Sequence, residues 1–395
     1  MNFPGGTELL NYEKPQSSLQ LAPGKAHNRP VIVLATALIT QETIFSNGLF
    51  QNILVLYRLF EALGYTAYLL VERRGETIKG YNTIQPEDLL KNPLPIHAFI
   101  EIGMSVQTVF RTYLRENGTK IIKLYLGNSL NIDIESINCT PGLDFPHHIV
   151  GDIDEIWTSP HYGQNLEYLT VLNGLAPNRG FIAPYVWDRC FVEGRMTKWE
   201  EPKDWRKMNI VICEPNISYQ KLFLVPLLIA EEFATKEAQW QGKVIIMNSD
   251  RFAANVHVTK SVLPQLKLMK EGRIELGKRK SIVELSKDYS SAVFIGNQVT
   301  NEFNYLTLEL MTAGFPLLHN AAAWSAFGYF YEPGSAAQLL KNVMQNHNSN
   351  LSTYRVQAEQ LAWAHSINNP TVQEKWKVLL GEHKVAGDFL GEHKE

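Results

Sequence analysis

Short apolar segments alternate with helical patterns along most of the chain, and this alternation constrains the fold more than any other feature. The continuous apolar run 31–35 is typical of a strand that is covered on both faces. Residues 48–63 then carry apolar side chains at helical spacing, Gly64 ends this helix, and 66–71 is the next strand. This order predicts a βαβ unit, with further strands at 98–102, 120–126, 155–158 and 180–183.

The second half of the chain repeats the alternation after a charged, proline-containing stretch at 199–207 that is typical of a linker. Strands are expected at 209–214, 243–247, 273–276, 292–295 and 315–319. Helices are expected at 219–235, 251–270, 281–288, 305–313, 336–345 and 351–365. Pro226 lies inside the first of these helices, so a start nearer Val225 is the alternative.

The pattern predicts an α/β protein made of two doubly wound, Rossmann-like parallel-sheet domains. The expected boundaries are 1–28 for an N-terminal arm, 29–205 for the first domain, 206–365 for the second domain, and 366–395 for a C-terminal helix or tail. A length of 395 residues suits two domains of this kind.

Composition excludes several classes of protein. The net charge of −3 argues against a general binder of polyanions, and no run of about 18 apolar residues predicts a membrane-spanning helix. Cys139, Cys190 and Cys213 are odd in number and widely spaced, which predicts neither a metal site nor a disulfide framework. Together with an N-terminus unlike a signal peptide, these features predict a cytoplasmic protein.

The stretch 301–320 gives the strongest indication of a ligand. It predicts a polar loop, a helix at 305–313 that Gly314 ends, and a short apolar strand. The N-terminus of a helix offers unpaired N–H groups and partial positive charge, so it receives phosphates. Glu309, one turn further in, can accept two hydrogen bonds from a sugar diol. Asn304, Tyr305 and Glu309 are therefore expected to bind a nucleotide-sugar diphosphate.

Other polar residues follow the strands of the second half, at the ends where ligands bind in open α/β sheets. They are Glu214, Asn216, Asn248, Asn297, Gln298, His319 and Asn320, with Lys221 at the start of the next helix. Lys221 is the candidate that neutralises a diphosphate, and an exposed lysine without a ligand is the alternative. For Asn320, a strand-end role is the alternative to ligand contact.

The stretch 301–320 also resembles the C-terminal signature of GT-B glycosyltransferases of the family-4 type, in which two glutamates precede a Gly-x-Pro turn. Glu309 matches the second glutamate, and Gly314-Phe315-Pro316 matches the turn. Asn301 stands at the position of the first glutamate, which is the one near the reacting sugar, with Glu302 beside it. The resemblance implies a catalytic position at Asn301, and the departure leaves the stereochemical outcome open.

Several shorter runs are similar to a bacterial, GT-B-like family catalogued only as a domain of unknown function. They include Glu101-Ile-Gly103, Asp154-Glu-Ile-Trp157, Pro184-Tyr-Val-Trp187-Asp188 and Glu214-Pro-Asn216-Ile-Ser-Tyr-Gln-Lys221. The resemblance implies glycosyl transfer from a nucleotide sugar between two domains that face across a cleft. In the GT-B pattern the donor lies on the second domain and needs no metal or other cofactor, and the acceptor enters from the first.

In the first domain, Gly48, Gln51 and Asn52 open a helix that is expected to face the acceptor, although an ordinary helix entry explains them equally. Glu101 ends an apolar strand, where desolvation raises a carboxyl pKa, so it is a candidate base. His161, after another strand, is its rival.

Two metal patterns are considered and set aside. Asp152-Ile-Asp154 resembles the metal-binding motif of GT-A transferases, but here it precedes its strand instead of ending it. His383 and His393 belong to a repeated tail sequence for which a solvated segment is the simpler interpretation.

Two alternatives to transfer stay open. They are an epimerase or hydrolase of nucleotide sugars with the same fold, and a non-catalytic module that binds nucleotide sugars. The acceptor of a transferase could be a glycan, a protein, a lipid-linked sugar or a modified nucleic acid.

Overall fold

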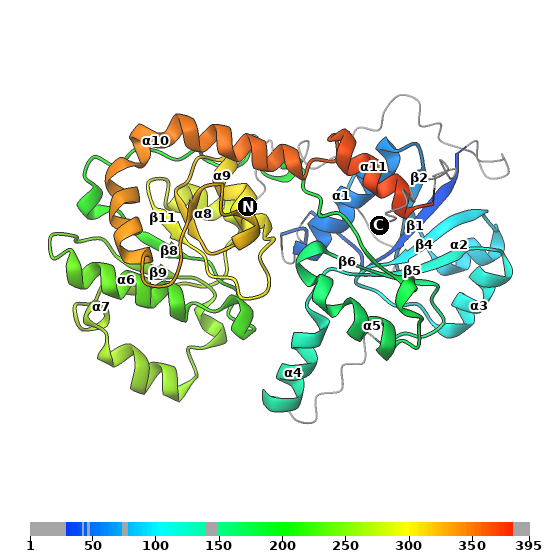
Figure 1. Ribbon diagram of the computed structural model, residues 1–395, viewed down its shortest axis with the longest axis horizontal. Coiled ribbons are helices and arrows are strands. Elements are labelled where there is room, and N and C mark those ends of the chain that lie inside the picture. The colour runs from blue at the N-terminus through cyan, green and yellow to red at the C-terminus, as the bar shows by residue number, and fades with distance from the viewer. Residues whose placement is uncertain (1–28, 42, 46–47, 73–77, 140–148, 382–395) are drawn as a thin grey trace, which may run out of the picture.

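The computed structural model describes residues 29–41, 43–45, 48–72, 78–139 and 149–381. The predicted arm 1–28 lies outside the described residues, as do His383 and His393. The described chain forms two lobes side by side, each built on one sheet with helices packed against it (Figure 1). The predicted pair of doubly wound α/β domains is confirmed.

The first domain contains seven parallel strands in the order β3-β2-β1-β4-β5-β6-β7. Their bounds are β1 Val31–Ala35, β2 Thr66–Leu70, β3 Thr83–Ile84, β4 Ile96–Glu101, β5 Lys120–Tyr125, β6 Glu155–Thr158 and β7 Gly180–Ile182. The helices are α1 Gly48–Ala62, α2 Pro86–Lys91, α3 Thr108–Glu116, α4 Ser129–Cys139 and α5 Leu166–Leu172. All five residues of β1 are fully buried between β2 and β4, as the continuous apolar run predicts.

The second domain contains six strands in the order β10-β9-β8-β11-β12-β13, again parallel. Their bounds are β8 Ile210–Ile212, β9 Val244–Ile246, β10 Ile274–Leu276, β11 Val293–Ile295, β12 Leu317–His319 and β13 Tyr329–Phe330. The helices are α6 Leu224–Lys236, α7 Lys267–Lys270, α8 Ile282–Asp288, α9 Tyr305–Thr312 and α10 Ala336–Ala364.

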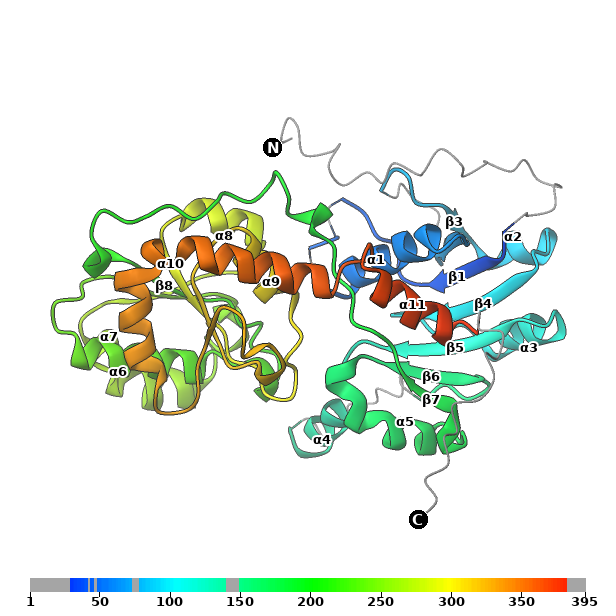
Figure 2. The same cartoon turned by 45° about the horizontal axis from the view of Figure 1, so that its top comes forward.

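The chain returns to the first domain at its C-terminal end. Helix α10 runs along the second domain, and α11 (Pro370–Leu379) lies on the first domain in both ribbon views (Figures 1 and 2). Trp376 of α11 packs at 5.6 Å between ring centroids from Phe60 and at 5.9 Å from Trp157. Residues 366–381 therefore contribute to the core of the first domain, although they follow the second domain in the sequence.

Three helices differ from their predictions. The single helix expected at 251–270 is wrong: short 3₁₀ and π turns precede α7, and Pro264, which lacks an N–H, lies in one of them. Helix α6 begins at Leu224, which places Pro226 in its first turn and agrees with the alternative start. The two expected terminal helices are one continuous helix, α10.

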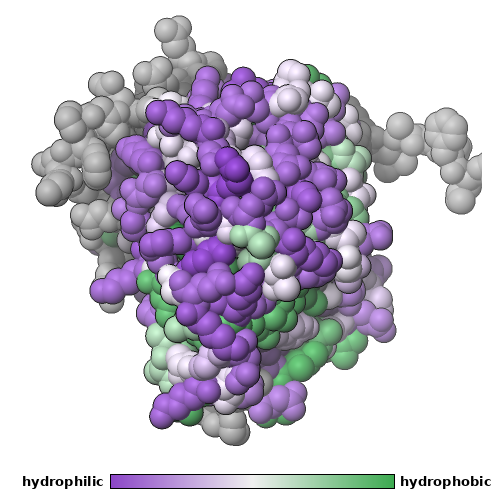
Figure 3. All heavy atoms as spheres, turned by 90° about the vertical axis from the view of Figure 1, so that its left-hand side faces the viewer, coloured by the Kyte–Doolittle hydropathy of each residue, from purple (hydrophilic) through white to green (hydrophobic). Residues whose placement is uncertain are grey.

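The outer face of the second domain is mostly hydrophilic, with hydrophobic residues gathered towards the lower part of the view (Figure 3). Exposed apolar side chains of this domain include Val225 and Leu228 on α6. None of the described helices combines the length and the apolar character needed to cross a membrane.

Candidate functional site

The carboxyl ends of β8, β11 and β12 bring the predicted polar residues of the second domain together. Glu214 follows β8, and its carboxylate accepts hydrogen bonds from the Asn297 N–H at 2.7 Å and from Gln298 Nε2 at 2.8 Å. Asn320, after β12, exchanges two hydrogen bonds with the backbone of Gln298, at 2.8 and 2.9 Å. Asn320 thus has the strand-end role that was the alternative to ligand contact.

Asn216 builds the loop that carries Lys221. Its backbone lies in the left-handed region (φ 55°), which asparagine tolerates better than most residues. Its amide donates to the Met247 carbonyl at 3.0 Å and accepts from the Phe223 N–H at 2.8 Å. The Asn216 N–H donates to the Lys221 carbonyl at 3.0 Å, which closes the loop and fixes the start of the lysine side chain.

The charge of Lys221 acts on Glu214 in this polar site. Among the described residues, no hydrogen bond or ion pair reaches its ammonium group. Burial lowers the pKa of Lys221, although the negative charge of Glu214 acts in the opposite direction. An ammonium group whose three N–H donors meet no described residue can receive an anion.

Glu309 is a buried carboxylate with no hydrogen-bond donor among the described residues. It lies on α9, and only 5% of its surface is exposed. Burial raises the pKa of Glu309 to about 7. Asn304 caps the same helix by accepting the Leu306 N–H at 3.1 Å, so its side chain shapes the N-terminus of α9. A buried acid without donors is costly to the fold unless a ligand supplies them.

The start of α9 also touches the first domain. The Tyr305 hydroxyl lies 2.7 Å from the Val186 carbonyl and 2.8 Å from Asn52 Oδ1 on α1. Asn52 therefore makes an interdomain contact. Gln51, one residue earlier, is buried, and its Oε1 has no hydrogen-bond partner. Gly48 begins α1, and a Cβ added there would meet no atom within 4 Å.

His161 and Tyr162, which follow β6, meet the loop 301–304 across the domain boundary. The Tyr162 hydroxyl donates to Asn301 Oδ1, and Asn301 Nδ2 donates to Gln298 Oε1 at 2.7 Å. The His161 ring lies 5.0 Å from that of Phe303, and its buried Nδ1 has no hydrogen-bond partner in the described part of the chain. Burial, with a contribution from the positive charge of Lys221, lowers the pKa of His161 to about 3, so the ring is neutral.

Glu101 occupies a different environment from the one expected of a base. Its carboxylate is fully buried and receives Arg111 Nε at 2.9 Å, Arg111 Nη2 at 3.2 Å and the Val106 N–H at 3.1 Å. Lys123 Nζ lies 3.4 Å from Oε2. Both carboxylate oxygens of Glu101 are bonded to cations or to a backbone N–H, so neither oxygen is placed to accept a proton from an acceptor in the way that the sequence led us to expect.

His319 has a structural environment too. Its Nε2 lies 2.8 Å from the Phe327 carbonyl, and Nδ1 accepts the Ala321 N–H at 3.3 Å. This pair of bonds holds a neutral tautomer with the proton on Nε2, and burial lowers the pKa of the ring.

Aromatic side chains that the sequence did not single out line the boundary between the domains. The Tyr185 ring lies 5.1 Å from Phe303 and 5.7 Å from Tyr305, and Phe303 stacks on Trp324 at 5.0 Å. Tyr185 belongs to the Pro184-Tyr-Val-Trp187 run, and this resemblance was the only feature of the sequence considered above that drew attention to it. No spacing rule connects it to residues more than a hundred positions away.

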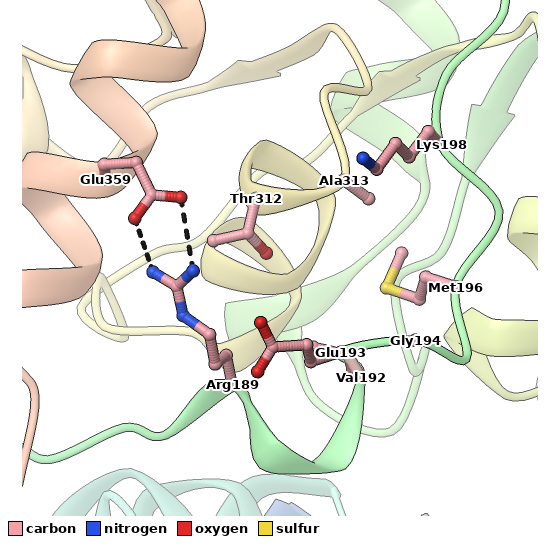
Figure 4. A pocket seen from close by; sticks show the side chains of 9 residues that line it. All are labelled: Arg189, Val192, Glu193, Gly194, Met196, Lys198, Thr312, Ala313 and Glu359. Carbon is pink, nitrogen blue, oxygen red and sulfur yellow. Dashed lines mark hydrogen bonds and ion pairs between the residues drawn. The ribbon is translucent and has the colours of Figure 1, made fainter. Parts of the chain in front are cut away.

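A cavity of about 220 Å³ lies where residues 189–198 pass the C-terminal end of α9 (Figure 4). Arg189 and Glu359 form a two-bond ion pair on its wall, at 2.5 and 3.3 Å. Thr312 and Ala313, which also line it, are at the C-terminal end of α9, where the helix carries partial negative charge. This cavity is therefore less suited to a phosphate than the N-terminal end of α9.

Within the described part of the chain, no three His, Cys, Asp or Glu side chains are grouped to hold a metal ion. Asp152 and Asp154 are half-exposed or exposed and each lies 3.6 Å from Arg115, at the amino end of β6. The Asp-x-Asp pattern thus lies at the amino end of the first domain's sheet, whereas the polar site lies at the carboxyl ends of strands in the second domain's sheet.

A family described as "Protein of unknown function (DUF2827)" matches residues 33–380. The chain belongs to this family. No curated protein matches the sequence of this DUF2827 protein.

Solved structures of glycosyltransferases share its fold. An alpha-glucosyltransferase in complex with UDP and a 13-mer DNA containing an HMU base has a TM-score of 0.57 at 11% identity, over 90% of this chain and 100% of that one. HepE of Anabaena in complex with UDP-glucose has a TM-score of 0.52 at 11% identity, over 89% and 100%. The α,α-trehalose 6-phosphate synthase of Burkholderia multivorans has a TM-score of 0.53 at 12% identity, over 90% and 98%. The DUF2827 protein thus has the GT-B fold.

Proposed function

We propose that the DUF2827 protein is a glycosyltransferase that moves a sugar from a nucleotide-diphosphate sugar to an acceptor hydroxyl. One observation carries the proposal. Lys221, beside the strand ends of the second domain, and Glu309 on α9 are groups of opposite charge that the fold withdraws from water, and no described residue gives either side chain a hydrogen bond or an ion pair. A nucleotide sugar offers both partners in one molecule, an anionic diphosphate and a diol.

The donor binds with its diphosphate at Lys221 and its ribose hydroxyls donating to Glu309. The N-terminal turn of α9, capped by Asn304, adds partial positive charge near the phosphates. The preorganised ammonium then stabilises the charge that develops on the departing diphosphate, so the reaction needs no metal.

In the chemical step the acceptor oxygen bonds to the anomeric carbon while the bond from that carbon to the diphosphate oxygen breaks. His161 is our candidate to accept the proton of the acceptor hydroxyl, because no described residue bonds to its Nδ1 and a diphosphate bound at Lys221 would offset the positive charge that helps to lower the pKa of the ring. Asn301 is a positioning residue, since both ends of its amide are already bonded to Tyr162 and Gln298. The family-4 signature implies retention at the anomeric carbon only in part, because Asn301 stands in place of its first glutamate, so the anomeric configuration of the product is the measurement that decides the stereochemical outcome.

The acceptor enters from the first domain along the start of α1. There Gln51 Oε1 is buried, and no described residue donates a hydrogen bond to it. We place the reaction in the cytoplasm, because Cys190 and Cys213 are free thiols. UDP and UDP-glucose are bound in relatives of the same fold, so UDP-sugars are the first donors to test.

The test has two parts, both in the presence of EDTA. A thermal-shift screen against UDP-, GDP- and ADP-sugars should raise the melting temperature for at least one donor. Incubation of that donor with pooled acceptors should then release the nucleoside diphosphate only when an acceptor is present. Release without acceptor would favour a hydrolase, and interconversion of the sugar an epimerase. Binding without any turnover would favour a non-catalytic module, and binding of no nucleotide sugar would refute the proposal.

A further inference from the structure

A continuous chain of hydrogen bonds joins Glu214 in the second domain to Tyr162 in the first. The Tyr162 hydroxyl donates to Asn301 Oδ1, Asn301 Nδ2 donates to Gln298 Oε1 at 2.7 Å, and Gln298 Nε2 donates to Glu214 Oε2 at 2.8 Å. All four side chains are buried. Every bond points towards Glu214, as an ionised carboxylate requires because it can accept but not donate.

Each member of this chain can also act in the opposite sense. A protonated Glu214 would donate to the oxygen of a rotated Gln298 amide, whose nitrogen would then donate to the oxygen of a rotated Asn301 amide. The Asn301 nitrogen would in turn donate to the Tyr162 oxygen. The number of hydrogen bonds stays at three, and the Tyr162 hydroxyl proton becomes free to donate elsewhere.

The charge that favours the ionised form of Glu214 comes from Lys221. Burial raises the pKa of Glu214 above its usual range, and the lysine opposes this rise. The other titratable groups near the pair are Cys213 directly after β8, Tyr331 after β13, and His161 from the first domain. Burial raises the pKa of the thiol and of the phenol and lowers that of the imidazole, so these three groups are neutral. An anion at Lys221 therefore offsets the charge that opposes protonation of Glu214.

We propose that a diphosphate bound at Lys221 makes Glu214 take up one proton from the solvent and so reverses the direction of the three hydrogen bonds. While the nucleotide sugar is bound, the Tyr162 hydroxyl is then free to donate a hydrogen bond to another group. The inference rests on the donor site proposed above and adds a role for two residues that this site does not use. Tyr162 acts as a positioning residue that reports donor occupancy across the domain boundary. Donor affinity then increases as the pH falls.

The experiment counts protons by calorimetry in buffers of different ionisation enthalpy. UDP-glucose, GDP-mannose and ADP-glucose are the probes, because the diester phosphates of nucleotide sugars do not titrate between about pH 6 and pH 9. Glu309 is expected to release a proton when the nucleotide sugar binds, because hydrogen bonds from the ribose hydroxyls favour its ionised form. The informative quantity is therefore the difference between the wild type and Glu214→Gln, in which the contribution of Glu309 cancels.

We expect the wild type to take up more protons than Glu214→Gln, by up to about one per bound donor at alkaline pH. The glutamine amide donates as a protonated acid would, so this variant should bind the donor and lose the pH dependence that Glu214 causes. Glu155→Gln is the matched control, because Glu155 is buried at the amino end of β6, where it pairs with Lys120. It should keep the wild-type proton count.

Gln298→Leu provides a second route if Glu214→Gln does not fold. Without the Gln298 amide, the ionised form of Glu214 loses a hydrogen bond. Glu214 is then protonated before the nucleotide sugar binds, so the number of protons taken up on binding falls. Equal proton counts in the wild type and in the variant that folds, with a donor bound, would overturn this inference and leave the donor site standing. Failure of the wild type to bind any of the three probes would instead remove the proposed function, and this inference with it.

Discussion

Glu101 in the first domain and Glu309 in the second are both buried carboxylates near the carboxyl end of a parallel sheet, but their surroundings differ. Glu101 is surrounded by Arg111, Lys123 and a backbone N–H. Glu309 receives no hydrogen bond from any described residue, and burial raises its pKa to about 7. The comparison shows that burial alone does not identify a functional acid. The fold supplies the partners of a structural acid, whereas the partners of a binding acid must come from outside.

The largest effect is expected from Arg111→Met, which tests the structural side of the comparison. The substitution leaves Glu101 buried with only Lys123 to balance its charge, so the free energy of unfolding should fall by about 3–5 kcal/mol. Chemical denaturation measures the change. The double variant Glu101→Leu with Arg111→Met should recover much of the loss, because no uncompensated carboxylate remains. A single variant as stable as the wild type would contradict the structural role.

Lys221→Met tests the binding side. No described residue gives the ammonium a hydrogen bond or an ion pair, so its removal should weaken donor binding by about 100- to 1,000-fold. The melting temperature should change little, because Glu214, which loses the opposing charge, can take up a proton. Calorimetry with the donor found in the screen measures the affinity. Lys236→Met is the matched control, because Lys236 is an exposed lysine of α6 paired with Glu232. Loss of stability without loss of affinity would place Lys221 with the structural residues.

Glu309→Gln separates stability from function. The folded-state pKa of Glu309 is raised, so the native state binds the proton more tightly than the unfolded state does, and native stability falls as the pH rises to about 7. At pH 8 the variant should therefore be more stable than the wild type by roughly 3 kcal/mol, and below about pH 4 the difference should vanish. Transfer activity should nevertheless fall. Denaturation at the two pH values, with initial rates, tests both statements.

The smallest effect is expected from Arg189→Ala. Its ion pair with Glu359 has good geometry, but both side chains are more than a third exposed. The free energy of unfolding should therefore fall by less than about 1 kcal/mol, and this difference should shrink as salt is added. A larger loss would show that the contact between Arg189 and Glu359 of α10 stabilises the protein more than the exposure of the two side chains suggests.

The sequence predicted five of the second domain's six strands and α9 closely, because each of these strands is a short apolar run bounded by polar residues or glycine; the two-residue strand β13 was not predicted. Positions at strand ends also indicated that Glu214 and Gln298 lie together, which the structure shows, whereas the binding roles of Lys221 and Glu309 stay predictions. The same reasoning placed Glu101 in the site, because a carboxylate at a strand end looks the same whether or not an arginine ten residues later reaches it.

Local pattern was also insufficient where contacts join distant segments. Trp376 packs on Phe60, and Tyr162 bonds to Asn301, across separations that no periodicity encodes. At 251–270 the apolar spacing indicated one helix, but Pro264 interrupts the hydrogen bonding that such a helix needs.

The sequence by itself determined the two parallel-sheet domains, because the period of apolar residues and the position of glycine and proline act over a few residues. It also determined which polar residues follow the strands of the second sheet at their carboxyl ends. Only the tertiary structure decided which buried charges have partners and which do not. That outcome depends on atoms from separate segments meeting within hydrogen-bond distance, and those segments meet only when the chain has folded.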